Sequence, residues 1–117
     1  MVNDELPADR AHRIADAVES IERLVTQLRD HQDLSHEEYT DPAEQDRRDA
    51  IERKFVKLTE ATVDIVTELC KQEVEKLPER RKPRIDALVA EGVVDSSLGE
   101  RLKTALGFRD VLAHTYG

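Results

Sequence analysis

The end of the chain, residues 109–117, carries three side chains whose types are suited to chemistry. Arg109 supplies a guanidinium, which can hold a phosphate through two parallel hydrogen bonds. His114 supplies an imidazole that titrates near neutral pH and can move protons. Tyr116 supplies a phenol that can donate, accept or be modified. Apolar residues stand between them, and an ordinary solvated helix end would not need this combination.

The spacing limits how these groups can cooperate. Arg109 and His114 are five residues apart, which places them about 140° apart around a straight helix. Arg109 and Tyr116 are seven apart and lie nearly above one another. One ideal helix therefore does not aim the guanidinium and the imidazole at the same phosphate. Two arrangements would do so: a motif that straddles a helix end, or two copies that pool their groups across a two-fold axis.

A purely structural explanation of the same residues is also open. A cation and an imidazole near a C-terminus often interact favourably with the helix dipole, and the ring of Tyr116 can simply cap the core. A bare five-residue spacing favours this explanation when it is taken without other signals. Phe108 directly before Arg109, and Tyr116 after it, shift the balance towards a functional motif.

The pattern R-x-x-x-x-H-x-Y over residues 109–116 resembles the signature of the HepT-like family within the HEPN superfamily. Members are small all-helical ribonuclease toxins paired with a minimal nucleotidyltransferase antitoxin. The resemblance extends beyond the motif, because the expected order of long, long, short and final helices is similar too. It implies a homodimer with a composite cleft, which selects the two-fold arrangement.

The resemblance also implies a mechanism, namely metal-independent RNA cleavage in which the 2′-hydroxyl of the RNA attacks the adjacent phosphorus, with no cofactor. His114 would act as general base or acid, and Arg109 would stabilise the charge that grows on phosphorus oxygens. Tyr116 matches the tyrosine that the partner enzyme adenylylates, which would block the cleft by bulk and charge.

Two departures from the family pattern bear on activity. Asp110 stands where members often carry Asn. Its carboxylate can orient His114 or Arg109, so it joins them as a candidate catalytic residue, but it also repels phosphate and puts full nuclease activity in doubt. Members usually continue past the tyrosine for another helical stretch, whereas this sequence stops at Gly117, so either the product is short or its end is missing.

The rest of the sequence predicts an all-α fold, an antiparallel bundle of four to five helices in one domain over residues 1–117. Apolar residues at three- and four-residue steps predict a first helix from Asp9 to about residue 31. Residues 35–40 are expected to form a loop. Asp41 and Pro42 then predict a second helix start. That helix would run to Lys76, about 50 Å, so we expect a kink or an overhanging end.

The only dense basic cluster follows, in residues 79–84. We expect a solvated loop there, with an RNA-binding patch as the weaker alternative; its candidate residues are Arg80, Arg81, Lys82 and Arg84. A short helix over residues 84–91 should end at Gly92. Asp95 or Ser96 should cap the last helix, which leads to Phe108.

Composition excludes several classes. The net charge of −8 argues against a general nucleic-acid coat protein but not against a local basic site. Cys70 is the only cysteine, so an intrachain disulfide and a cysteine metal site are excluded, and we expect it to be small and buried. His12, His31 and His36 have no metal-ligand spacing and are expected at the surface. No signal peptide or membrane-spanning run is evident, which favours a cytoplasmic protein.

Two other functions remain open beside the RNA-cleaving toxin. The chain can be a HEPN module without nuclease activity, in which Arg109 and the basic cluster hold a nucleotide or the partner enzyme. It can also be a plain helical interaction protein whose motif is structural. A neighbouring gene for a small nucleotidyltransferase would favour the first two over the third.

Overall fold

The structure, a computed structural model, describes residues 6–116 of the chain, with side chains up to His114. The described residues contain helices and no strand, which confirms the all-α class. The elements in chain order are α1 (Ala8–Arg29), α2 (His36–Thr40), the 3₁₀ turn η1 (Pro42–Glu44), α3 (Gln45–Glu73), α4 (Arg81–Ala90) and α5 (Ser96–Tyr116).

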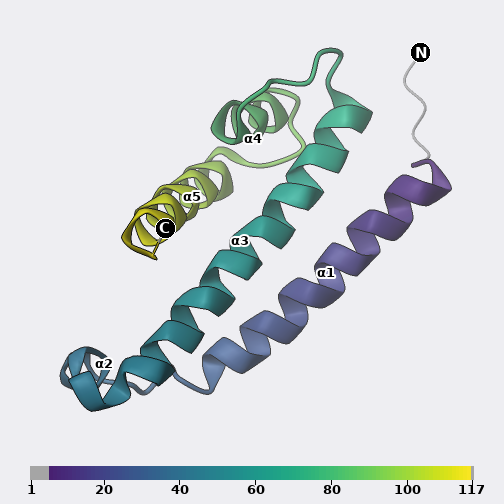
Figure 1. Cartoon of the computed structure of the whole chain (residues 1–117). Helices are drawn as coiled ribbons and strands as arrows, with labels where there is room; N and C mark the ends of the chain where they lie inside the picture. The colour runs from purple at the N-terminus through teal and green to yellow at the C-terminus, as the bar shows by residue number, and fades with distance from the viewer. Residues whose placement is uncertain (1–5, 117) are drawn as a thin grey trace.

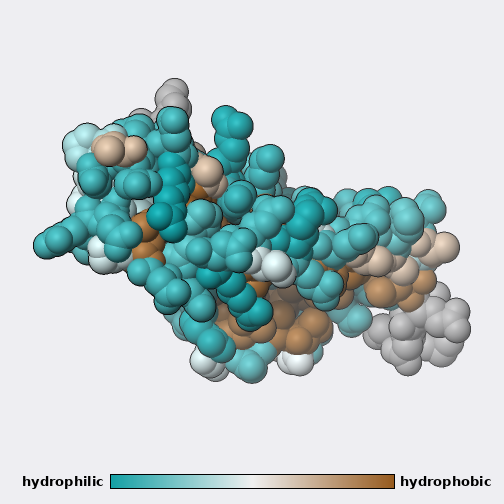
Figure 2. Space-filling view, turned by 90° about the horizontal axis from the view of Figure 1, so that it is seen from below, coloured by the Kyte–Doolittle hydropathy of each residue, from teal (hydrophilic) through white to brown (hydrophobic). Residues whose placement is uncertain are grey.

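Helix α3 is the centre of the arrangement (Figure 1). Helix α1 runs antiparallel along one side of it, and α4 and α5 pack on it from the other side and on each other. The molecule measures 58 × 26 × 24 Å, and its radius of gyration of 16.4 Å exceeds the roughly 13 Å of a compact domain of this length. The bundle is therefore thin, and apolar side chains gather along one margin of its surface (Figure 2).

The core lies where α3, α4 and α5 meet. Cys70, Ile85 and Leu88 are almost completely buried there, with Val66 and Leu106 around them. The prediction of a buried Cys70 is confirmed: its thiol donates to the carbonyl oxygen of Arg84 at 3.2 Å. Burial raises the pKa of this thiol, although the charge of Arg84 opposes the rise.

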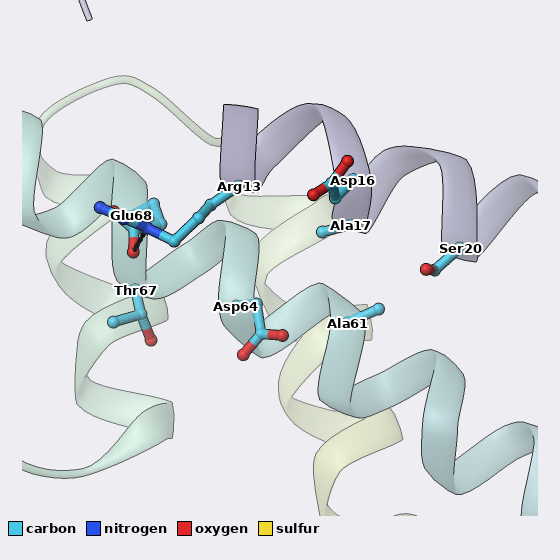
Figure 3. A pocket seen from close by; sticks show the side chains of 8 residues that line it. All are labelled: Arg13, Asp16, Ala17, Ser20, Ala61, Asp64, Thr67 and Glu68. Atoms are coloured by element: carbon cyan, nitrogen blue, oxygen red, sulfur yellow. Dashed lines mark hydrogen bonds and ion pairs between the residues drawn. The ribbon is translucent and has the colours of Figure 1, made fainter. Parts of the chain in front are cut away.

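Helix α1 is fastened to α3 by a carboxylate. Glu68 lies in the interface with only 9% of its side chain exposed. It accepts hydrogen bonds from Arg13 Nε at 2.8 Å and from Arg10 Nε at 3.2 Å. Figure 3 shows the Arg13–Glu68 contact at one end of the cavity between the two helices. Two guanidiniums on one buried carboxylate fix how α1 lies along α3.

The segment expected to be a loop at residues 35–40 is a short helix instead. Ser35 accepts from the backbone N–H of Glu38, and the Glu38 side chain accepts from the N–H of Ser35. This is a capping box, whose Ser-x-x-Glu spacing is present in the sequence. Asp41 caps the following turn as expected, through the N–H of Ala43. Helix α3 ends at Glu73, three residues before Lys76.

The basic cluster is also not a loop. Helix α4 begins at Arg81 rather than at Arg84, with Arg80 as the residue before it. Pro83 lies in the first turn, where helical N–H groups have no partner within the helix, so the ring does not end it. Gly92 ends α4 as predicted, with φ +75°, a conformation that costs a side chain about 1 kcal/mol or more.

Helix α5 is continuous through the terminal motif. Asp95 caps it by accepting from the N–H of Leu98 at 2.8 Å. Because it runs unbroken from Ser96 to Tyr116, the motif does not straddle a helix end. Of the two arrangements that would join Arg109 and His114, the one within a single chain is therefore wrong.

Candidate functional site

Arg109 lies on the side of α5 that faces α3, with 24% of its side chain exposed. One guanidinium nitrogen is 3.4 Å from Oε1 of Glu60 on α3, and the other is 3.4 Å from Oδ1 of Asp110. Its Nε is the only buried side-chain nitrogen or oxygen in the described part of the chain without a hydrogen-bond partner. The guanidinium thus has two long contacts with carboxylates, and its Nε–H is still available to donate a hydrogen bond.

Asp110 joins two arginines from different helices. Its Oδ1 accepts from Arg81 of α4 at 2.9 Å as well as from Arg109. Partial burial raises the pKa of this carboxyl, but the hydrogen bond and charge of Arg81, helped by Arg109, outweigh it and hold the pKa below its ordinary value. Asp110 is therefore ionised at neutral pH, and much of its charge is balanced locally.

His114 is exposed in the last turn of α5. Because α5 is one helix, the five residues from Arg109 turn the imidazole about 140° away, towards solvent. One copy of the chain does not bring these two groups together. The side chain of Tyr116, the expected modification site, lies outside the described residues.

The basic cluster lies next to the motif in space. The sequence does not show this, because the cluster comes 25 to 30 residues before the motif. Arg80, Arg81 and Lys82 line a surface pocket together with Asp110 and Leu106, which we call the α4–α5 pocket. Lys82 reaches over Gly107, where its Nζ would be 3.4 Å from an added Cβ. Lys82 of α4 thus lies against α5 at position 107, two residues before Arg109.

Arg84 behaves differently from the other three basic residues. Its Nε donates to the carbonyl oxygen of Pro78 at 2.7 Å, and another nitrogen donates to Thr67 Oγ1 at 3.0 Å. These bonds hold the connector between α3 and α4 in place. Arg84 therefore supports the position of the cluster rather than facing solvent with it.

Two large hydrophobic residues beside the motif are exposed on α5. Phe108 is 53% exposed and Val111 is 60% exposed, although both are large hydrophobic residues. The Phe108 ring meets the edge of Phe55 of α3 with centroids 5.3 Å apart. Exposed apolar groups next to charged ones mark this face as a candidate contact surface.

The other histidines lie away from this site. His12 is exposed and 3.5 Å from Asp16, and Nδ1 of the half-buried His31 accepts from Arg47 at 3.1 Å. Within the part of the chain that the structure describes, no group of three or more His, Cys, Asp or Glu residues is arranged to hold a metal ion. In that same part, no helix is long and apolar enough to cross a membrane.

Comparison with known families decides the relationship. The model of the family described as "Ribonuclease HepT-like" matches residues 14–117, from the second turn of α1 through the whole terminal motif. The chain belongs to this HepT-like ribonuclease family. The resemblance carried by Arg109, His114 and Tyr116 is thereby confirmed at the level of the family. Comparisons with curated proteins and with solved structures gave no match.

Sequence reasoning missed Glu60. It lies 49 residues before Arg109, and nothing in the sequence links the two. An exposed glutamate on the polar side of a long helix carries no signal of its own. Only the packing of α5 on α3 shows that this carboxylate holds the guanidinium of the motif.

Proposed function

We propose that this chain is the toxin of a HEPN/nucleotidyltransferase toxin–antitoxin pair, a metal-independent endoribonuclease that acts as a homodimer in the cytoplasm. The observation that carries the proposal is the family match, which includes the R-x-x-x-x-H-x-Y residues. Family membership supports RNA as the substrate. The basic residues near Arg109 also support RNA as the substrate, although the chain as a whole is acidic.

Three features support the homodimer. The continuous α5 separates Arg109 from His114 within one copy, so a second copy is needed to complete the site. The exposed Phe108 and Val111 beside the motif offer apolar area for such a contact. The thin shape of the bundle leaves surface that a two-fold partner would cover.

The proposed chemistry follows from the residue types. His114 of one copy takes the proton of the 2′-hydroxyl, and the freed 2′-oxygen forms a bond to phosphorus. The bond from phosphorus to the 5′-oxygen breaks, and the imidazolium of the second copy donates a proton to that oxygen. Arg109 stabilises the negative charge on the non-bridging oxygens through its guanidinium. The products are a 2′,3′-cyclic phosphate and a 5′-hydroxyl.

Asp110 has a positioning role in this scheme. It holds Arg109 and Arg81 together, and its own charge is largely offset by them. The repulsion of phosphate that the aspartate would otherwise cause is therefore reduced. Arg80, Arg81 and Lys82 are proposed to contact RNA phosphates, whereas Arg84 is committed to the connector.

The proposed control is adenylylation of Tyr116 by the nucleotidyltransferase partner. Its support is the position of the tyrosine, two residues after His114 in the motif. The nucleotide would add bulk and negative charge beside the imidazole, and both exclude RNA.

One observation favours the alternative without cleavage, in the form of a HEPN module that binds its partner enzyme, since a nucleotide phosphate would need the same guanidinium. Both available carboxylates, Glu60 and Asp110, already contact Arg109. If these contacts persist in the presence of RNA, the guanidinium cannot stabilise a reacting phosphate.

Cleavage of an RNA pool by wild-type chain, His114→Ala and Arg109→Ala tests the proposal. His12→Ala is the matched control, because His12 is an exposed histidine on another helix. Intact mass is followed in parallel with the nucleotidyltransferase and ATP. We expect cleavage by wild type and His12→Ala only, and loss of cleavage as an adenylate appears on Tyr116. A dimeric wild-type chain that cleaves no RNA would decide for the binding module.

A further inference from the structure

Four cations line one groove between α1 and α3. Arg23 comes from α1, and Arg53, Lys54 and Lys57 come from α3. We call this the α1–α3 groove. Helix α1, which forms one wall of the groove, lies on the opposite side of α3 from α4 (Figure 1).

Within residues 6–114, these four cations have no ion-pair partner. Elsewhere in the described part of the chain, several cations are paired with carboxylates: Glu68 pairs with Arg10 and Arg13, Asp110 with Arg81 and Arg109, and Asp86 and Glu100 with Lys103. Among the described residues, none of the four groove cations forms an ion pair or a hydrogen bond. In a chain of net charge −8, a groove lined by these four cations and by only two carboxylates, Glu60 and Asp64, is locally positive and suited to an anion.

The groove has a charge boundary. Beyond Ser20 and Asp64 it continues into the cavity of Figure 3, whose charged lining is dominated by carboxylates. Asp16 and Asp64 enter it from the two helices, and Glu68 closes it with its arginines. A polyanion bound to the basic half is repelled at this boundary. It is therefore not drawn past Asp64 into the acidic cavity.

This end of the groove leads to the proposed catalytic residue. Glu60 lines the α1–α3 groove one turn from Asp64, and its carboxylate is 3.4 Å from the guanidinium of Arg109. Arg109 also contacts Asp110, which lines the α4–α5 pocket and accepts a hydrogen bond from Arg81. There Arg80 and Lys82 also form no ion pair among the described residues. Arg109 thus lies between two sets of unused cations.

We propose that the α1–α3 groove binds the phosphate backbone of single-stranded RNA and delivers it past Glu60 to Arg109. The proposal rests on the ribonuclease function proposed above. Single-stranded RNA fits because a groove lined by cations can follow its phosphate backbone, and the track continues through Arg109 into a second basic site. When RNA arrives, its phosphate replaces Glu60 at the guanidinium.

The test is RNA binding to Arg53→Gln/Lys57→Gln in the His114→Ala background, which keeps the RNA intact. The probe is a fluorescein-labelled single-stranded RNA of about 12 nucleotides, followed by anisotropy across a salt series. Removing two phosphate contacts should lower the slope of log K against log salt by about 1.4 and weaken binding about 10- to 30-fold at ~0.1 M salt. Both side chains are exposed, so folding should be unchanged, as checked by circular dichroism.

The control is Lys76→Gln/Arg101→Gln in the same background. It changes the net charge by the same amount, and both residues are exposed and outside the two basic sites. We expect its affinity to stay within about twofold of the parent.

Equal affinity of the groove and control variants would overturn the proposal, and would be the result if the groove served an acidic protein instead. Cleavage by the His114-containing chain is measured separately. If the groove variant binds RNA weakly and the control variant does not, the RNA-binding groove is supported. If in addition no chain cleaves RNA, only the proposed ribonuclease function is refuted.

Discussion

Replacing Glu68 by Gln tests how α1 is held on the rest of the molecule. The glutamine keeps the shape of the side chain but removes the charge that faces Arg10 and Arg13. Glu68 is 7% exposed in the interface, whereas 54% of the Arg13 side chain is exposed and screened by water. The two arginines remain, with one neutral acceptor in place of a carboxylate.

The expected cost comes from the charge-assisted hydrogen bonds. Such a bond contributes about 1.5–3 kcal/mol where both groups are buried. Because the arginines are partly solvated, we discount the sum and expect a loss of about 2 kcal/mol in the free energy of unfolding. For a chain of this size that corresponds to a melting temperature lower by roughly 8 °C.

The loss should depend on pH in a definite direction. The hydrogen bond from Arg13 lowers the pKa of Glu68; burial opposes this, and the charges of Arg13 and Lys71 and the bond from Arg10 reinforce it. The pKa of Glu68 is therefore lower in the folded than in the unfolded state. Its ionised carboxylate stabilises the fold at pH values above the ordinary pKa of 4.5, and this stabilisation is lost as pH falls through the folded-state pKa. Wild type and Glu68→Gln should therefore differ at neutral pH and converge in acid.

Urea unfolding followed by circular dichroism at one protein concentration measures this difference at about pH 7 and about pH 3. Glu73→Gln is the control, an exposed carboxylate on the same helix, and should change stability by less than about 0.5 kcal/mol. A Glu68→Gln cost below that level at pH 7, or the same cost at both pH values, would refute the account of α1 docking.

Three further outcomes are expected. Leu88→Ala should lower the free energy of unfolding by about 2–5 kcal/mol in urea titrations, because Leu88 is completely buried; a smaller loss would mean that the core collapses around the cavity. Gly99→Ala should destabilise because its Cβ would lie 2.7 Å from Val89 Cγ2, and adding Val89→Ala should recover part of the loss; no recovery would exclude this clash as the cause. Tyr39 is half-buried and donates a hydrogen bond to Glu52, and the partial burial and this bond raise its pKa to about 12. Phenolate absorbance in Tyr116→Phe should therefore titrate near that value, and stability should fall as pH rises from about 10; a midpoint near 10 would contradict this account.

Local signals in the sequence predicted much of the fold. Apolar spacing located α1, the Asp41-Pro42 pair located the turn before α3, and Gly92 and Asp95 correctly marked the end of α4 and the start of α5. These features succeed because each acts within one or two turns of helix. The capping box at Ser35 is an equally local feature of the sequence. The prediction of a loop there was wrong because the Ser-x-x-Glu spacing was not taken into account.

The candidate site was only partly predictable, because its remaining contacts join distant parts of the chain. The motif residues are recognisable from type and spacing, and α5 places them as the spacing requires. The pairing of Arg81 with Asp110 spans 29 residues, and that of Glu60 with Arg109 spans 49. Such pairs depend on which faces of α3, α4 and α5 meet, and no local pattern specifies that. The hydrogen bonds from Arg84 to Pro78 and Thr67 could not be predicted from the sequence for the same reason.

The burial of Cys70 gives the protein a reporter of its own opening. The sequence contains a single cysteine, and that thiol is completely inaccessible, with a raised pKa, where three helices meet. A thiol reagent can react only after α4 or α5 separates from α3, so the rate of alkylation measures that opening equilibrium. The native chain can thus report, without any added label, whether RNA, a second copy or an adenylate tightens the helices that carry the motif. A cysteine introduced on the surface for labelling will react first, and nothing in the core will compete with it.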